Sequence, residues 1–389
     1  MPAAPRREPT LAVLCSHPIQ YFTPLYRSLA RRGRIRVKAI YLSDAGAEPH
    51  FDHGFGREVR WDLPLLKGYD SAVLQPGTDI TGKNFWSRHD PKLKAILDDL
   101  RPDWVLLYGY ASRMNWMARN WAIRHGVRLA YWSDSNVRDP RARGKAAVKN
   151  LVLKHLFFRD LDAVLVTSDA NEQYVRRCGV DPSQMHRVPF AIDMRRFERS
   201  RSIPLGQPRD FDFVWVGKLM ALKRPQDYLD ALQRLVDRSR LRPRALMLGD
   251  GPLRADVLAA GASLRARGIL EFRGFVNQRE MPAALQSADT LVFTSEIEAF
   301  GLVALEAAAA GLALLVADNI GCVGHGDLAR NGVNALTFTV RDVAGLAEAM
   351  QRVLTDPALR VAMQRWSVEI AQQYDTERVA DALESVILS

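Results

Sequence analysis

Cysteine is scarce in this chain. Its 389 residues include three cysteines, Cys15, Cys178 and Cys322, which lie far apart and in no metal-ligand spacing. Dispersed thiols of odd number give no disulfide framework, so we expect a reducing compartment and a cytoplasmic location. The sequence also lacks any spaced cluster of Asp or His residues of the kind that holds a cation, and we therefore expect no metal and no other cofactor.

Long apolar runs are absent as well. The longest, 307–317, contains Gly311 and is well short of the roughly 20 residues that cross a bilayer. The apolar run 11–15 near the N-terminus is too short for a secretory signal. We expect no membrane-spanning segment.

Several nucleotide-binding motifs are missing too. Neither the GxGxxG fingerprint nor a Walker A sequence occurs, which counts against dinucleotide oxidoreductases and P-loop NTPases. The net charge of +10 is not accompanied by a helix-turn-helix, zinc or RNA-binding signature, so we expect no nucleic-acid partner. The positive excess is one-sided: residues 1–200 hold 33 Lys and Arg against 21 Asp and Glu, and residues 201–389 hold 21 against 23. Such a basic half fits an anionic membrane surface or a phosphate-bearing acceptor.

The chain has instead a strand–helix alternation that runs twice. Its length and its 48% apolar content suit two globular domains. Short buried strands, expected at 10–15, 36–42, 102–108, 127–132 and 162–168 and again at 211–216, 244–248, 269–273, 290–294 and 311–317, alternate with amphipathic helices. This predicts an α/β fold of two doubly wound, Rossmann-like parallel-sheet domains, 1–200 and 201–370, joined by a linker rich in proline and charge at 199–210.

Two segments of the first half stand out from this alternation. Residues 43–88 form a long section without periodicity, which we expect to be a functional loop reaching towards an acceptor. A helix expected at 141–159 carries Lys145, Lys149 and Lys154 among apolar residues. It either lies on an anionic membrane face or is a half-buried surface helix that extends its lysines into solvent.

The stretch 295–306 is chemically the most distinctive. Gly301 marks the entry to an alanine-rich helix, and Glu298 and Glu306 bracket seven residues around that entry. A helix N-terminus attracts anions, whereas carboxylates repel phosphate unless they are present to hold hydroxyl groups. A diphosphate joined to a polyol, as in a nucleotide-sugar, satisfies both. The alternative is a packing helix with a solvated glutamate.

Three other strand ends of the second half carry related features. Gly217 and Lys218, with Lys223, follow the first strand, and glycine turns at 249–252 and 274–277 follow the next two. Parallel sheets gather the carboxyl ends of their strands at one edge, so these loops should share a cleft. There Lys218 and Lys223 would neutralise a diphosphate, Glu306 would take ribose hydroxyls and Glu298 would meet the sugar.

The second half resembles the donor domain of the retaining glycosyltransferases of the GT-B fold, family four. The resemblance rests on 216–218 with Lys223, 248–252, 272–274, 288–289, 295–306 and 310–311, in the family's order. It implies that Lys218 and Lys223 hold the diphosphate and stabilise the leaving group, that Glu298 contacts the donor sugar, and that Glu306 binds the ribose. The remaining donor-binding positions that it implies are Gly217, Ala299, Phe300, Gly301 and Leu302. Lys218 stands where the family more often has arginine.

The first half resembles the family more loosely. The sequence 17–22, His-Pro-Ile-Gln-Tyr-Phe, is similar to the first loop of a subgroup, and Asp134 falls where many members carry a histidine. His17 either serves near the donor sugar or caps the loop after the first strand, and Asp134 is the acceptor-side candidate. The resemblance also implies that the last helix, within 371–389, crosses back to the N-terminal, acceptor-side domain.

These observations predict a retaining hexosyltransferase that moves a sugar from a nucleotide diphosphate donor to a hydroxyl of a lipid-linked or saccharide acceptor. Cell-surface polysaccharide or glycolipid biosynthesis is the expected setting, at the inner face of the membrane or near it. A non-catalytic protein of the same fold and a sugar-nucleotide epimerase or phosphorylase of that fold are the alternatives.

Overall fold

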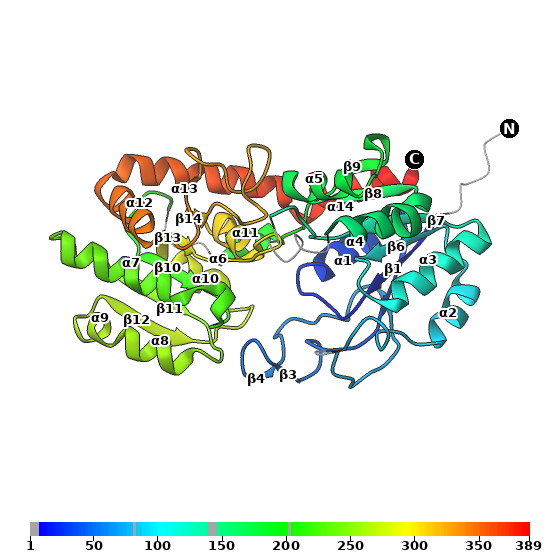
Figure 1. Ribbon diagram of the computed structural model, residues 1–389, viewed down its shortest axis with the longest axis horizontal. Coiled ribbons are helices and arrows are strands. Elements are labelled where there is room, and N and C mark those ends of the chain that lie inside the picture. Colours follow the sequence, from blue (N-terminus) through cyan, green and yellow to red (C-terminus); the bar gives the residue numbers. More distant parts are fainter. Residues whose placement is uncertain (1–7, 81–82, 139–145, 201–203) are drawn as a thin grey trace.

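Two α/β lobes lie side by side in the computed structural model, which describes residues 8–80, 83–138, 146–200 and 204–389 (Figure 1). Within these residues the first lobe contains a parallel sheet of seven strands in the order β5-β2-β1-β6-β7-β8-β9. Its strands are β1 (Thr10–Cys15), β2 (Arg36–Tyr41), β5 (Asp70–Val73), β6 (Trp104–Tyr108), β7 (Arg128–Trp132), β8 (Ala163–Val166) and β9 (Met185–Arg187).

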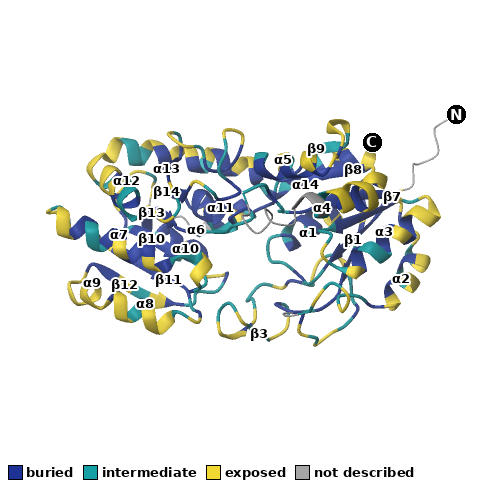
Figure 2. Cartoon of the chain, in the orientation of Figure 1, coloured by how far each residue is buried: buried dark blue, intermediate teal, exposed yellow. Residues whose placement is uncertain are grey.

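The second lobe contains a parallel sheet of six strands in the order β12-β11-β10-β13-β14-β15, again within the described residues. These strands are β10 (Phe211–Val216), β11 (Ala245–Leu248), β12 (Leu270–Gly274), β13 (Ala288–Phe293), β14 (Ala313–Ala317) and β15 (Ala335–Phe338). Every residue of β13 and β14 is buried, because helices cover both faces of a parallel sheet (Figure 2).

The helices follow the alternation. Those of the first lobe are α1 (Thr23–Arg32), α2 (Lys92–Leu100), α3 (Arg113–His125), α4 (Ala146–Val152), α5 (Asp169–Arg177) and α6 (Met194–Ser200). Those of the second are α7 (Pro225–Arg238), α8 (Arg254–Ala260), α9 (Ala262–Ala266), α10 (Met281–Gln286), α11 (Leu302–Ala309), α12 (Val343–Thr355) and α13 (Pro357–Ala371), followed by α14 (Thr376–Leu388). No helix in the described part of the chain is long and apolar enough to cross a membrane.

Strand order places a crevice in each sheet. In the first lobe β1 lies between β2 and β6, and in the second β10 lies between β11 and β13. The chain turns to opposite faces of the sheet after the two neighbouring strands at such a point, which leaves a space beyond their carboxyl ends. The loops after β1 and β10 therefore begin at the two positions where ligands are expected.

The predicted α/β fold of two parallel-sheet units is confirmed, while several local expectations were wrong. The section 43–88 contains an antiparallel hairpin of β3 (His50–Asp52) and β4 (Arg57–Val59), as well as β5 at the edge of the first sheet. Three-residue strands are too short to give a period-2 signal. The strand β15 and the helix α6, which runs into the expected linker, were also missed.

Two expected helices differ in detail. The helix expected at 253–267 is divided at Gly261. An added Cβ there would lie 3.0 Å from Leu270 Cδ2, so the absence of a side chain at Gly261 lets this segment pack closely on β12. The helix expected at 141–159 is described from Ala146 onward as α4, and it continues as a π-helical turn over Leu153–Phe157. Residues 141–145 lie outside the described part.

The C-terminal helix lies on the first lobe. Helix α13 belongs to the second lobe, and α14 follows it onto α1 (Figure 1). The Ile192 amide donates to the Tyr374 carbonyl at 2.8 Å, and the Thr376 amide donates to the Ile192 carbonyl at 3.0 Å, where the chain returns. The domain limits at residues 200 and 370 stay predictions.

Charge holds α14 in place. Arg32 donates to Glu377, Asp381 and Glu384 on α14, and Arg34 also reaches Glu384 at 2.8 Å. The Glu384 side chain is 1% exposed, so its charge depends on these two arginines. Removing a partner of a buried charge is far more destabilising than removing a partner of an exposed one.

We expect Arg32→Ala to destabilise the protein by about 2–3 kcal/mol, because it leaves the buried Glu384 carboxylate with Arg34 alone. The matched control is Arg31→Ala, whose side chain is 59% exposed and pairs with Glu377. Urea denaturation measures both variants, and the control should lose less than about 1 kcal/mol. Equal losses would contradict a special role for the buried pair.

Candidate functional site

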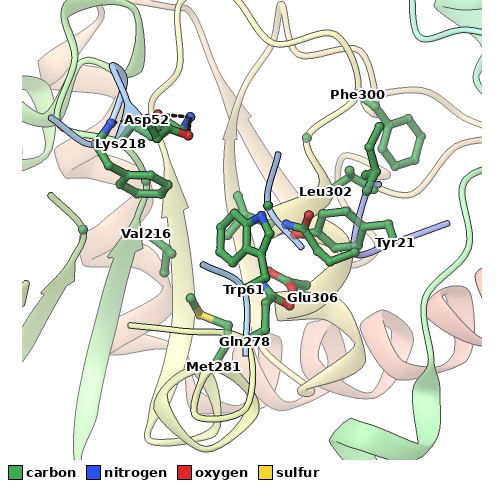
Figure 3. Close-up of a pocket in the computed structure, with 18 of the residues that line it drawn as sticks. Tyr21, Asp52, Trp61, Val216, Lys218, Gln278, Met281, Phe300, Leu302 and Glu306 are labelled. Atoms are coloured by element: carbon green, nitrogen blue, oxygen red, sulfur yellow. Dashed lines mark hydrogen bonds and ion pairs between the residues drawn. The ribbon is translucent and has the colours of Figure 1, made fainter. Parts of the chain in front are cut away.

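A cavity of about 440 Å³ lies where the two lobes meet, and loops from both contribute to its wall (Figure 3). The residues singled out from the sequence that line it are His17, Asp134, Gly217, Lys218, Lys223, Glu298, Phe300, Gly301, Leu302 and Glu306. Ala299 lines an adjoining pocket of about 160 Å³, which shares Asp134 and Glu298 with the main cavity. The structure therefore brings together residues that are up to 289 positions apart, from His17 to Glu306.

The start of α11 forms one end of the cavity. Gly301 is its N-cap, with a φ of 100°, and no side chain caps the helix. A Cβ at this position would come 2.7 Å from Phe293 Cε1, so a glycine is required both by the backbone conformation and by the space. The unpaired amides of the first helical turn are thus available to an anion in the cavity.

The two lysines are held on the loop after β10. Lys223 ends a short 3-10 turn, and its carbonyl accepts a hydrogen bond from Thr294 Oγ1 at 2.9 Å. Thr294 in turn accepts from the buried Trp215 indole at 2.9 Å, so the loop is tied to both β10 and the end of β13. A Cβ at Gly249 would lie 1.9 Å from the Gly217 carbonyl oxygen, so the neighbouring turn packs directly on the lysine loop.

Both lysines are paired with carboxylates in this structure. Lys223 forms an ion pair with Glu298, within the second lobe. Lys218 Nζ contacts both carboxylate oxygens of Asp52, at 2.9 and 2.8 Å, and Asp52 belongs to the first lobe. These four side chains are between 17% and 34% exposed, so solvent screens both pairs and each is weak enough to exchange for a bound anion.

Glu306 is the most deeply buried acid of the site. Its side chain is surrounded by Tyr21 and Gln278 (Figure 3), and its Oε1 has no hydrogen-bond partner among the described residues. Burial raises the pKa of Glu306 to about 7, against the opposing effects of Arg196, Tyr21 and Gln278. A buried carboxyl oxygen without a partner, on a side chain that lines the cavity, is suited to accept from a ligand hydroxyl.

The titratable residues of the first lobe that the sequence singled out are His17 and Asp134. Burial, followed by the positive charges of His50, Lys218 and Arg88, lowers the pKa of His17 to about 4, so the imidazole is neutral near pH 7; its Nδ1 lies 2.9 Å from Ser16 Oγ. Burial, and then the charge of Glu298, raises the pKa of Asp134. Asp134 and Glu298 thus face one another across the junction of the two lobes.

Several cavity residues were missed by sequence reasoning. Tyr21, Asp52, Trp61 and Gln278 all line the cavity, and Tyr21 reaches Glu306 from the opposite lobe. Tyr21 lies within the loop sequence 17–22 that had been singled out, and Asp52 and Trp61 lie within the section predicted to be a functional loop. Gln278 follows the predicted glycine turn by one residue, but no sequence signal distinguished its side chain.

The arrangement is suited to an elongated ligand with an anionic centre and hydroxyl groups on either side. Two lysines and a helix N-terminus supply positive charge, and Glu298 and Glu306 supply acceptors. Among the described residues no group of three or more His, Cys, Asp or Glu side chains is placed to hold a metal ion.

Comparison with known proteins decides the family. The model of the "Glycosyl transferases group 1" family matches residues 197–367, and that of the "Glycosyl transferase 4-like domain" matches residues 18–191. The chain belongs to the group 1 glycosyltransferases. The predicted family and its GT-B fold are thereby confirmed.

Relatives of the chain have different names and are distant. It is 32% identical over 237 residues to a glycogen synthase of Mycobacterium tuberculosis, a match covering 59% of this chain and 55% of that protein. It is 27% identical over 304 residues to a D-inositol 3-phosphate glycosyltransferase of Actinosynnema mirum, covering 71% and 69%. The chain thus spans about half the length of the first of these relatives.

Solved structures share the whole fold at low identity. Anabaena HepE in complex with UDP matches with a TM-score of 0.73 and 16% identity, covering 97% of this chain and 98% of that one. The lipopolysaccharide outer core galactosyltransferase WaaB matches with a TM-score of 0.69 and 15% identity, covering 97% and 99%.

Glu306 makes stability depend on pH in a definite direction. An unfolded glutamate loses its proton near its ordinary pKa of 4.5, whereas folded Glu306 keeps its proton until about pH 7. Its contribution therefore favours the folded state below pH 4.5, diminishes between those values, and becomes a constant penalty above pH 7. We expect Glu306→Gln to stabilise the free protein at pH 8 by up to about 3 kcal/mol relative to wild type, and by little at pH 4.5.

Urea denaturation of the two proteins at both pH values measures this difference. The matched control is Glu348→Gln on α12, because the Glu348 side chain is exposed to solvent; this variant should show the same pH dependence of stability as wild type. A Glu306→Gln variant that is equally destabilised at both pH values would contradict a raised pKa.

Proposed function

We propose that this protein transfers a hexose from a nucleotide diphosphate-sugar to a hydroxyl acceptor with retention of configuration. The observation that carries the proposal is the convergence of Lys218, Lys223, Glu298, Glu306 and the uncapped start of α11 on one cavity between the lobes. Each feature matches one part of the donor: cations and amides for the diphosphate, and acceptors for the hydroxyls of ribose and hexose.

In this proposal, the catalytic effect comes from the groups that stabilise the leaving diphosphate. Cleavage of the bond between the sugar and the phosphate leaves additional negative charge on the departing diphosphate. Lys218, Lys223 and the amides of Gly301 and Leu302 are fixed before the reaction, so they stabilise that charge without reorganising. This arrangement needs no metal ion.

The two glutamates bind hydroxyl groups on either side of this centre. Glu306 would accept from the ribose, since its buried oxygen lacks a partner, and Glu298 would leave Lys223 to contact the hexose. Across the cavity, neutral His17 can donate one hydrogen bond to the sugar. The raised pKa of Asp134 suits a group that takes a proton from the acceptor hydroxyl.

We expect Lys223→Ala to lower kcat/KM for sugar transfer about 100- to 1000-fold, because it removes a charge that stabilises the leaving diphosphate. UDP-, GDP- and ADP-sugars are tested first by thermal shift and then by release of the nucleoside diphosphate. UDP-glucose is the first choice, since HepE has been solved with it.

The matched control is Lys94→Ala, an exposed lysine on α2 that should leave kcat/KM unchanged. Inactivity of the wild type with every donor, with Glu298→Ala leaving donor binding unaffected, would reject catalysis and favour a non-catalytic protein of the same fold.

The acceptor side suggests a contact with an anionic membrane surface. Leu151, Val152 and Leu156 are 58%, 43% and 55% exposed, and we call them the apolar patch. Lys154 and Arg159 are exposed beside it, within the half of the chain that carries the positive excess. Apolar side chains among cations fit a bilayer of anionic lipid.

The lysines do not all point to this surface. Lys149 Nζ lies 5.8 and 5.4 Å from the ring centres of Tyr110 and Tyr174, so it faces the lobe, and Lys145 lies outside the described residues. We therefore assign the contact to the apolar patch and Lys154. A cytoplasmic enzyme docked in this way would act on a lipid-linked acceptor in cell-surface polysaccharide or glycolipid assembly.

We expect sedimentation with anionic liposomes to capture the wild type, and Leu151→Ser with Leu156→Ser to reduce the bound fraction at least about fivefold by removing apolar contact with the bilayer. Ile123→Ser on α3, where the side chain is 43% exposed, is the matched control and should bind as wild type does. Equal binding of all three proteins would show that these leucines belong to an ordinary solvent-exposed helix.

A further inference from the structure

A segment of the first lobe reaches the second lobe beside the cavity. It comprises residues 46–62, which include the β3–β4 hairpin, and we call it the strap (Figure 1). Gly46, His50, Asp52, Phe55 and Trp61 of the strap line the same cavity as the lysines and glutamates. The strap is therefore one wall of the site.

The strap encloses Lys218. Besides its two contacts with Asp52, Lys218 Nζ lies 4.7 Å from the centre of the Phe55 ring. A Cβ at Gly54 would lie 2.6 Å from Lys218 Cδ, so the strap backbone packs directly on the lysine side chain. Burial opposes ionisation of Asp52, but Lys218 and the amides of Phe55 and Gly54 hold its pKa below the ordinary value.

A second set of contacts fastens the strap without using Lys218. Asn277 Nδ2 donates to the Arg60 carbonyl at 2.9 Å, and the Arg279 amide donates to Asp62 Oδ1 at 3.1 Å. The Trp61 ring lies 6.2 Å from that of Phe275, between centres. These contacts can keep one end of the strap at the second lobe when Lys218 is released.

Because Asp52 is paired with Lys218, a diphosphate that enters the cavity must compete with it for this lysine. A carboxylate with both oxygens on one ammonium occupies that cation as a phosphate oxygen would. Lys218 cannot pair fully with Asp52 and with a diphosphate at the same time. The diphosphate carries more charge than Asp52 and also contacts Lys223 and the start of α11, so it has the stronger set of partners. Asp52 has the advantage of being held beside Lys218 by the chain.

We propose that Asp52 is an internal competitor for the phosphate site, and that a donor diphosphate binds Lys218 by displacing it. The inference rests on the proposed function in one respect, since it takes Lys218 to be a phosphate ligand. Unlike the Lys223–Glu298 pair, which lies within one lobe, the Asp52–Lys218 pair connects the two lobes. When a donor replaces Asp52 at Lys218, the β3–β4 hairpin loses this contact with the second lobe and becomes looser.

Asp52→Asn tests this with little disturbance of the turn. Asparagine keeps the oxygen that accepts from the amides of Gly54 and Phe55, at 2.8 and 3.1 Å, and removes the charge. The probe is inorganic pyrophosphate, titrated calorimetrically at fixed ionic strength into the full-length protein. We expect its Kd to be about tenfold lower for Asp52→Asn than for wild type, as expected for loss of one competing charge-assisted contact.

Asp70→Asn is the matched control. Asp70 is also an aspartate of the first lobe paired with a lysine, Lys38, at 2.6 Å, but it lies outside the cavity. Its variant should bind pyrophosphate as wild type does. An unchanged or higher Kd for Asp52→Asn would overturn the proposal, the latter because it would make Asp52 a residue that positions Lys218 for the anion.

Hydrogen exchange gives a second measurement. Saturating pyrophosphate should raise amide exchange within residues 50–57 of wild type, and Asp52→Asn should show that raised exchange without ligand. Exchange that is unaffected by pyrophosphate overturns the proposal. Tighter pyrophosphate binding by Asp52→Asn, with no sugar transfer by wild type, would support this inference and reject the proposed function; an active wild type with no change in pyrophosphate Kd would do the reverse.

Discussion

The parallel pairing of β10 with β11 on one side and β13 on the other is the constraint on which the site depends. Val216 is level with Leu248, and Val214 with Leu291, so the three strands end at the same edge. The lysine loop, the Gly249 turn and the entry to α11 therefore all begin at that edge. The same arrangement at β1 delivers the loop that carries His17 and Tyr21 from the opposite lobe. The cavity therefore lies between the carboxyl ends of the central strands of the two sheets.

The contacts between the lobes differ in how readily they can break. Arg187 pairs with Asp327, whose side chain is fully buried and which also accepts from the Asp169 amide at 3.1 Å. Separating that pair would leave a buried charge without its partner, which costs about 3–5 kcal/mol. The Asp52–Lys218 pair is partly exposed, and pairs near the surface contribute about 1 kcal/mol or less. Any opening of the lobes should therefore begin at the β3–β4 hairpin, which carries Asp52, with the Asp327 contact and α14 serving as the fixed side.

The sequence predicted those parts of the molecule whose signals are local. Strands such as β13 and β14 are buried on both faces and appear as unbroken apolar runs, and the glycine, lysine and glutamate positions at strand ends follow from the direction of a parallel sheet. Asp52 and Trp61 could not be assigned, because their importance arises from contacts with Lys218 and Phe275 more than 150 residues away. The hairpin that carries them has strands of three residues, too short for a periodic pattern. The burial of Glu306 likewise depends on Tyr21 from the other lobe, whereas its sequence allowed a solvated carboxylate equally well.

In the free protein, the charged groups of the site are neutralised by other side chains or by a proton, whereas in the complex the ligand would neutralise them. Two cations and a buried acid gathered beside one cavity would be unfavourable if each were left alone. Asp52 occupies Lys218, Glu298 occupies Lys223, and a proton occupies Glu306 below about pH 7. Binding a polyanion with hydroxyl groups is then an exchange in which each occupant is replaced by a part of the ligand. Affinity reflects the difference between the two sets of contacts, which is why Asp52 affects how tightly the ligand is held although it does not touch the bound ligand.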